Sequence, residues 1–288
     1  MHTIENRYRD GVLWQSRTAD VDVDVDEYDE TPVGDLIESA RLAPLWLALG
    51  WHDIKQRYRR SVVGPFWIAI STLLFLAVMS FLYAALFKQP YSVFLPMATA
   101  GLVTWSFISA CLTEGARVFI DQSTAIKQLP LPLPVHVFRL LWLQFVIMLH
   151  NAVVIVLIGF LTGQAPDHSI VLILPAMALL LINLGWMALF LGVVSARYRD
   201  VPIIVGALMP IMFLATPIFW TRDLLSGDRS WIVEYNPIAN MIEVVRGPVL
   251  GTAPPSTAWL ACILTAVVGW TVTIAIYGRC RYRIASWV

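Results

Sequence analysis

Residues 62–87 read VVGPFWIAISTLLFLAVMSFLYAALF, a run of 26 residues without a charged side chain. A helix needs about 20 predominantly apolar residues to cross a hydrocarbon core of ~30 Å. The run is continuously apolar instead of alternating, which favours a helix over a strand of a membrane barrel. It therefore predicts a transmembrane helix.

Five more uncharged runs follow, over residues 91–113, 140–161, 170–196, 201–221 and 256–278. In hydrocarbon only a helix satisfies its backbone polar groups within one segment, so the six runs predict an all-α polytopic membrane protein with six transmembrane helices. The composition agrees, because 58% of residues are apolar and 14% are charged, against about 45–50% and 25% in soluble proteins. The loops that remain are too short to hold a soluble catalytic domain.

The charges predict an orientation in the membrane. The 20 Lys and Arg residues balance the 20 Asp and Glu residues, so no net field recruits nucleic acid. With the N-terminus inside, the inner segments hold sixteen of these bases and the outer loops hold four. By the positive-inside rule both termini are expected in the cytoplasm. The first thirty residues lack the apolar core of a signal peptide.

Two segments precede the first run. Residues 1–40 are expected to form a disordered acidic cytoplasmic tail, because eleven of the twenty acids lie among the first 38 residues. Residues 41–61 predict an amphipathic helix that lies flat on the inner leaflet. It has an apolar face and a basic remainder, formed by Leu47, Trp51, Ile54 and Tyr58 and by Lys55, Arg57, Arg59 and Arg60. The alternative is a positive anchor that only fixes topology.

The loop at residues 121–134 (DQSTAIKQLPLPLP) is the other cytoplasmic candidate. Pro130, Pro132 and Pro134 favour an extended or turn conformation and oppose a helix. A stiff protrusion of this kind suits the transmission of force, although a plain helix connection explains the pattern equally well.

The runs themselves contain no carboxylate, which disfavours ion-driven transport. His150, Asn151 and Asn183 are the strongly polar residues inside them, and we expect these side chains to form hydrogen bonds between helices. No cluster of acids, histidines or serines predicts a catalytic site, and the three cysteines lack the spacing of a metal site.

Two runs carry aromatic residues that could line a pore. Trp67, Ser71 and Phe81 share one face of the first run, and the fifth run ends in aromatics. Pro210 predicts a kink or a break in the fifth run. Pore aromatics can stack on sugars, whereas terminal aromatics also form interface belts. The candidate channel residues are Trp67, Ser71, Phe81, Phe213, Phe219 and Trp220.

The outer region, residues 222–255, contains a further helix signal. Asn236 and Pro237 supply an N-cap and a first helical residue, Glu243 and Arg246 form an i, i+3 pair, and Gly247-Pro248 predicts a stop. We expect a short amphipathic helix at the outer surface, which could act as a re-entrant lid.

Three segments resemble a known family: WHDIKQRYRRSVVGPFW at 51–67, ARYRD at 196–200 and NPIANMIEVVRGPVLG at 236–251. They are similar to the membrane subunit of ABC-2 type polysaccharide exporters, which carry O-antigen, capsule or teichoic acid and have the type V ABC exporter architecture. The likeness covers residues 40–288. The chain has no GxxxxGK[ST] phosphate loop, so the resemblance implies that ATP and Mg²⁺ bind a separate ATPase subunit.

The resemblance implies a homodimer of this chain, two ATPase copies below it, and a polyprenyl-diphosphate-linked polysaccharide as cargo. Residues 41–61 become the interface helix and 62–288 the transmembrane domain, in which the first and fifth runs line the conduit. Contact with the ATPase is then expected at Trp51, Tyr58, Asp121, Lys127 and Gln128. The lipid diphosphate is expected at Arg57, Arg59 and Arg60, and the outer gate at Asn236, Pro237, Glu243 and Arg246.

The HNAVV stretch from His150 is most similar to O-antigen exporters of a bacterial inner membrane. Two alternatives stay open: an ABC-2 drug or lipid exporter, and an integral-membrane glycosyl- or acyltransferase.

Overall fold

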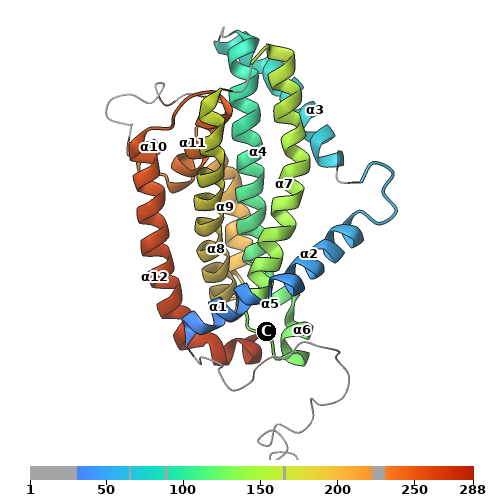
Figure 1. Ribbon diagram of the computed structural model, residues 1–288, viewed down its shortest axis with the longest axis vertical. Coiled ribbons are helices and arrows are strands. Elements are labelled where there is room, and N and C mark those ends of the chain that lie inside the picture. The colour runs from blue at the N-terminus through green and yellow to red at the C-terminus, as the bar shows by residue number, and fades with distance from the viewer. Residues whose placement is uncertain (1–30, 65, 88–89, 165–166, 221, 223–230) are drawn as a thin grey trace, which may run out of the picture. The chain divides into compact units, whose positions relative to one another are not determined.

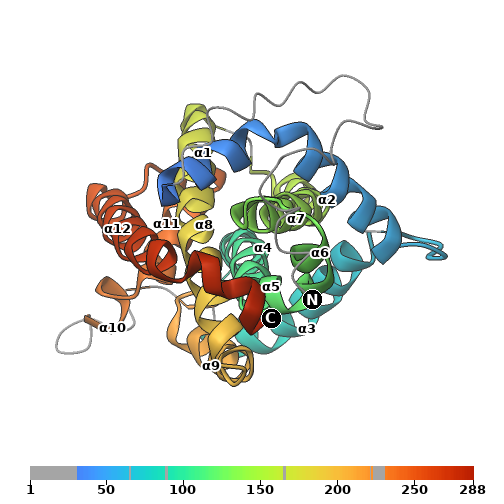
Figure 2. The ribbon, with the colours of Figure 1, turned by 90° about the horizontal axis from the view of Figure 1, so that it is seen from below.

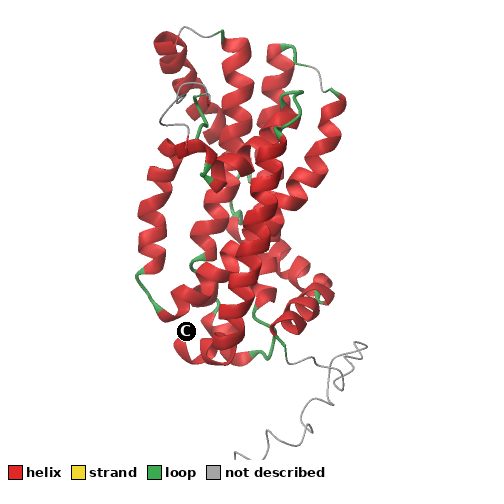
Figure 3. Ribbon diagram, turned by 90° about the vertical axis from the view of Figure 1, so that its left-hand side faces the viewer, coloured by secondary structure: helices red, strands yellow, loops and turns green. Residues whose placement is uncertain are grey.

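The computed structural model describes residues 31–64, 66–87, 90–164, 167–220, 222 and 231–288, which fall in the unit Thr31–Val288. This part is helical and contains no strand (Figure 3). Its helices are α1 (Pro32–Arg41), α2 (Ala43–Arg57), α3 (Phe66–Phe87), α4 (Tyr91–Gly115), α5 (Val118–Asp121), α6 (Ser123–Gln128), α7 (Pro134–Thr162), η3 (His168–Leu172), α8 (Ile173–Arg197), α9 (Val201–Ala215), α10 (Trp231–Glu234), α11 (Pro237–Val249) and α12 (Ser256–Trp287).

The prediction of an all-α membrane protein is confirmed. Within the described residues, five helical segments are long and apolar enough to cross a bilayer, namely α3, α4, α7, η3 with α8, and α12. The fifth predicted run, 201–221, differs from expectation. Its helix α9 has only 15 residues, continues through Pro210, and ends at Ala215, after which residues 216–220 are not helical.

Helix α4 forms the centre of the bundle and packs against α3, α7, α8 and α11 (Figure 1). Small residues allow the closest approach, since a Cβ atom on Gly115 would lie 2.9 Å from that of Ala188 in α8. Ala98, Ile108 and Cys111 of α4 are fully buried. The core therefore follows this helix, whereas α3 and α12 expose apolar faces.

The polar residues inside the runs behave differently from one another. The Asn183 amide donates to the Cys262 carbonyl oxygen at 3.1 Å and joins α8 to α12, as the sequence predicts. The His150 ring instead contacts the Val146 carbonyl of its own helix at 2.7 Å. The Asn151 side-chain oxygen is buried without a partner in the described part of the chain.

The expected disordered tail is too long. Residues 1–30 lie outside the described residues, but 32–41 form helix α1, so the prediction of disorder up to residue 40 is wrong for its last nine positions. Thr31 caps the helix by accepting a hydrogen bond from the Gly34 amide at 2.9 Å, and Pro32 follows as a favourable first residue.

Helices α1 and α2 together form a strap, residues 32–57, across one end of the bundle (Figure 2). The strap packs against α7 and α12, and we call this end, with α5 and α6, the lower end as in Figure 1. The predicted stiff loop at 121–134 is mostly helical, since α5 and α6 precede the proline-containing segment 129–133. The prolines prevent helix formation only after Gln128, where α6 ends.

Candidate functional site

Helix α2 approaches α7 closely because it carries a glycine at the contact. A Cβ atom on Gly50 would lie 2.8 Å from Cδ1 of Trp142 and 3.2 Å from the Arg139 carbonyl oxygen. One helical turn later, Ile54 is buried against Leu143 and Ile147 of α7. The amphipathic pattern therefore holds the helix against the bundle, with Gly50 and Ile54 at the contact.

A forked ion pair strengthens this contact. The Arg139 guanidinium donates to both carboxylate oxygens of Asp53, at 2.6 and 2.5 Å, and its third nitrogen donates to Gln122 at 3.1 Å. The Arg139 and Asp53 side chains are only 17% and 22% exposed. Planar fork pairing is the strong geometry for arginine and carboxylate, so α2, α7 and the α5–α6 turn are fixed to one another.

The end of α2 is joined to α4 by a second pair. Nη2 of Arg57 lies 3.1 Å from each carboxylate oxygen of Glu114, near the end of α4. Burial raises the pKa of the neighbouring Tyr58 phenol, which Arg57 opposes and Glu114 reinforces. Tyr58 therefore stays protonated at neutral pH and keeps a hydroxyl donor beside the pair.

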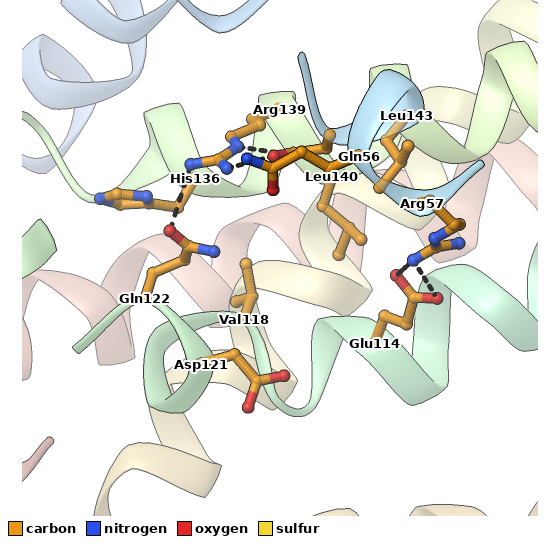
Figure 4. Close-up of a pocket in the computed structure, with 11 residues that line it drawn as sticks. Gln56, Arg57, Glu114, Val118, Asp121, Gln122, His136, Arg139, Leu140 and Leu143 are labelled. Carbon is orange, nitrogen blue, oxygen red and sulfur yellow. Dashed lines mark hydrogen bonds and ion pairs between the residues drawn. The ribbon is translucent and has the colours of Figure 1, made fainter. Parts of the chain in front are cut away.

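These groups line a cavity of about 450 Å³ between α2, α4, α5 and α7 (Figure 4). Its polar walls come from Asp53, Gln56, Arg57, Glu114, Asp121, Gln122, His136 and Arg139, and its floor comes from Val118, Leu140 and Leu143. Charged groups of both signs face it, so the cavity suits a polar protein segment better than an apolar molecule. It is a candidate docking site at the lower end.

The opposite end contains a buried polar cluster. Asn236 accepts from the Ile238 and Ala239 amides, which confirms it as the N-cap of α11. Arg246 lies 2.5 Å from Glu243, as its i, i+3 spacing predicts, and also donates to the Pro217 carbonyl at 2.7 Å. Arg246 thus holds the non-helical segment after α9 against α11.

Helix α11 lies at the end of the bundle opposite the strap (Figure 1), and it is buried there instead of resting on the surface. Ten of its residues, from Ile238 to Pro248, are buried, and it packs against α4, α8 and α12. Nor does Gly247-Pro248 stop the helix, which ends at Val249. The residues of the proposed gate, Asn236, Pro237, Glu243 and Arg246, therefore lie in or at the edge of the bundle's interior.

Comparison with known sequences identifies the architecture that these two ends belong to. The sequence model of the ABC-2 type transporter family matches residues 44–250, which include the strap's α2, the lower-end cavity and α11. The chain belongs to the ABC-2 type transporter family.

Individual relatives are similar over most of this ABC-2 transporter chain. An O-antigen export system permease protein RfbA of Klebsiella pneumoniae is 27% identical over 243 residues, covering 81% of this chain and 91% of the relative. A second Klebsiella protein of that name is 26% identical with the same coverage. One from Myxococcus xanthus is 25% identical over 69% of this chain and 77% of its own length.

Within this ABC-2 transporter subunit, the predicted ATPase contacts fall into two groups. Asp121 lines the lower-end cavity and pairs with Arg117 at 3.3 Å, and Tyr58 lies beside Arg57 and Glu114 of its wall. Lys127 and Gln128 are exposed on α6. Trp51 is 47% exposed on α2, so its ring stays accessible to a partner, and its predicted contact with the ATPase stays a prediction.

The three arginines expected at the lipid diphosphate do not form one cluster. Arg57 is held by Glu114, whereas Arg59 and Arg60 are exposed in the turn after α2. Arg60 has a φ of 70°, a conformation that costs free energy in a residue with a side chain. Two of the three cations are therefore exposed, and the third is engaged by Glu114.

The candidate channel residues also divide. Trp67 and Phe81 are 54% and 73% exposed on α3, and Ser71 is exposed beside them. Phe219 is only 6% exposed, and its ring lies 5.6 Å from Tyr83 and 5.7 Å from Phe213. Trp220 follows it, half-buried. The structure thus leaves the α3 set at the surface and places Phe213 and Phe219 in an aromatic cluster.

Sequence reasoning missed Asp53, Glu114 and Arg139 as site residues. Their partners lie 57 and 86 positions away along the chain, so no local spacing reveals the pairs. The available signal was weaker: Glu114 and Arg139 flank predicted transmembrane runs, where a charge is expected at the membrane boundary.

Asp53→Asn is expected to loosen α2 from α7. Arg139 would lose its ionised partner in a largely buried position, which costs about 1.5–3 kcal/mol. Hydrogen–deuterium exchange of the α2 amides in the purified protein should speed up. Lys55→Gln, an exposed change on the same helix, is the control and should leave exchange unchanged. Equal protection in both variants would show that the ion pair does not hold α2.

Proposed function

We propose that this chain is the channel-forming membrane subunit of an ATP-driven exporter that moves polyprenyl-diphosphate-linked polysaccharide across a bacterial inner membrane, with O-antigen as the cargo. The observation that carries the proposal is the match along most of both chains to permeases named for O-antigen export. In this proposal the lower end faces the cytoplasm, because the basic residues gather there.

A separate ATPase subunit would supply the power stroke from the cytoplasm, with ATP and Mg²⁺ bound there. The lower-end cavity supports this role, since it presents charged groups of both signs between α2, α5 and α7. Helix α6, with exposed Lys127 and Gln128, lies beside it as the coupling element. Arg59 and Arg60 remain available for the phosphates of the lipid carrier, because anionic head groups attract each cation by about 1 kcal/mol.

Two copies of the chain would enclose the conduit. The exposed apolar faces of α3 and α9 support this arrangement, with Phe81 73%, Ile203 72% and Leu214 74% exposed. A polymer threaded between the copies would meet Trp67 and Phe81 first. Phe213 and Phe219 would pack beneath the residues that line the conduit, and α11 would close its outer end.

Two other functions remain as outcomes of the test. An ABC-2 drug or lipid exporter would respond to small amphiphiles instead of lipid-linked glycan. A membrane glycosyl- or acyltransferase would turn over substrate without ATP and without a partner.

The test uses the chain co-purified with its ATPase and reconstituted in vesicles. We expect lipid-linked polysaccharide to stimulate ATP hydrolysis and small amphiphiles to leave it unchanged. Trp67→Ala and Phe81→Ala should each reduce the stimulation about two- to twelvefold, because an aromatic contact contributes about 0.5–1.5 kcal/mol.

Phe160→Ala is the matched control, since this ring is 84% exposed on α7 and borders a cavity whose lining includes α4 and α11 but no residue of α3 or α9. Stimulation by amphiphiles alone would favour a drug or lipid exporter. Turnover of a glycosyl or acyl donor without nucleotide would replace the proposal altogether.

A further inference from the structure

The lower end of α12 contains a buried ion pair with the strap. A carboxylate oxygen of Asp35 in α1 lies 3.0 Å from Arg281 and 2.7 Å from the Tyr277 hydroxyl, which donates to it. Asp35 is 5% exposed, Arg281 9% and Tyr277 1%. Removing two charges from water costs several kcal/mol per ion, so such a pair is weak as a device for stability alone. Its best-attested use is to fix one element on another in a single register.

The backbone is shaped for this contact as well. A Cβ atom on Gly278 would lie 2.6 Å from the ring of Pro32, so the first turn of α1 sits directly on α12. Further along the strap, Trp46 donates to the Ser39 carbonyl at 3.1 Å and packs on Phe138 of α7. The two helices of the strap are therefore joined to each other and to two transmembrane helices.

The last turn of α12 also holds the turn between α8 and α9. Arg199 donates to the Trp287 carbonyl at 2.9 Å, and the Arg197 guanidinium lies 5.6 Å from the Trp287 ring centre. These arginines belong to the ARYRD stretch, which precedes α9 directly. Helix α6 packs against α12 too.

We infer that the lower end of α12 is a mechanical relay, in which Asp35 and Arg281 position the strap and Trp287 passes its movement to α9. The inference rests on the proposed function. It adds that two elements expected to touch the ATPase, the strap and α6, meet one transmembrane helix whose end is tied to the start of α9. Asp35 and Arg281 are positioning residues and do not contact the cargo.

The relay requires that breaking the Asp35–Arg281 pair uncouple hydrolysis from export. The experiment measures, for the complex with its ATPase in vesicles, both ATP hydrolysis and polysaccharide moved. In Asp35→Asn and in Arg281→Gln we expect the complex to assemble and hydrolyse ATP, while polysaccharide moved per ATP falls about fivefold or more. The exchange Asp35→Arg with Arg281→Asp should restore at least half of the ratio.

Glu38→Gln is the matched control, a carboxylate-to-amide change on the same helix without an ion pair among the described residues. From the α9 side, Trp287→Ala and Arg199→Gln should lower the same ratio without disturbing Asp35. If changes at Asp35 prevent folding, the Trp287 and Arg199 variants still test the relay.

The possible outcomes distinguish a failure of the proposed function from a failure of the relay. Wild-type protein that moves no polysaccharide with ATP would overturn the proposed function. Wild-type export combined with an unchanged ratio in the Asp35, Arg281 and Trp287 variants would overturn the relay alone. If the polysaccharide moved per ATP falls in the single variants and the charge exchange does not restore it, the pair has a purely local role. That result would also contradict the relay.

Discussion

Arg246→Met is expected to lower the free energy of unfolding by about 3–5 kcal/mol, the usual cost of removing one partner from a buried ion pair. Arg246 is 6% exposed and donates to both Glu243 and the Pro217 carbonyl. Among the described residues, Glu243 would then keep only Arg222, at 3.7 Å, and the Pro217 carbonyl would lose the donor that Arg246 supplies. The midpoint of thermal unfolding of the purified protein measures the loss.

Two further variants separate charge from geometry at Arg246. Lys keeps the charge but cannot reach both acceptors as a planar fork, so Arg246→Lys should lose about half as much stability. Adding Glu243→Leu to Arg246→Met should recover part of the loss, because it removes the unpaired carboxylate. Arg283→Met, at an exposed site without an ion pair among the described residues, is the control. If Arg246→Met unfolds like this control, the cluster does not hold α11.

Gly269→Ala is expected to force α12 away from α8. The added Cβ atom would lie 2.1 Å from Cε2 of Trp186, far inside van der Waals contact. The Trp186 ring cannot simply withdraw, because its Nε1 donates to Asn183 at 3.2 Å and Asn183 in turn holds the Cys262 carbonyl. Overpacking of this kind costs about 1–3 kcal/mol or more. The unfolding midpoint and the yield of folded protein should both fall.

Gly206→Ala is the matched control, because a Cβ atom there meets no atom within 4 Å. It should leave stability unchanged or raise it slightly, since alanine has the higher helix propensity. Combining Gly269→Ala with Trp186→Leu should restore much of the loss by freeing space. Wild-type stability of Gly269→Ala would mean that α8 and α12 do not pack as described.

Helices and caps were predictable because their causes are local. Uncharged runs revealed the membrane helices, and Asn236-Pro237 revealed the start of α11. Contacts that depend on residues far away in the sequence could not be predicted in this way. The burial of α11 and the pairs of Asp35, Asp53 and Glu114 depend on residues at least 57 positions away or on packing between helices. Helix α1 is a different case, because Thr31 and Pro32 supply a local start signal that the prediction of a disordered tail overlooked. A local pattern reports that a face is apolar, but not which element covers it.

Trp51 and Phe219 show the same limit in the candidate site. Periodicity grouped Trp51 with Ile54 on one apolar face of α2, but in the structure Ile54 is buried against α7 while Trp51 is exposed. The difference arises because Gly50 and Asp53 set the line of contact with α7, and no local pattern shows this. Phe219 follows a helix that ends early, so its ring turns inward instead of continuing the face of α9.

The early end of α9 has a consequence for the surrounding lipid. At 1.5 Å per residue its 15 residues span about 22 Å, less than the ~30 Å of an average hydrocarbon layer. Wherever α9 borders lipid instead of a second copy, the bilayer would have to thin or its head groups would have to bend inward, a hydrophobic mismatch. In the proposed exporter, a sugar chain passing along α9 would therefore cross a hydrophobic layer thinner than the average bilayer core.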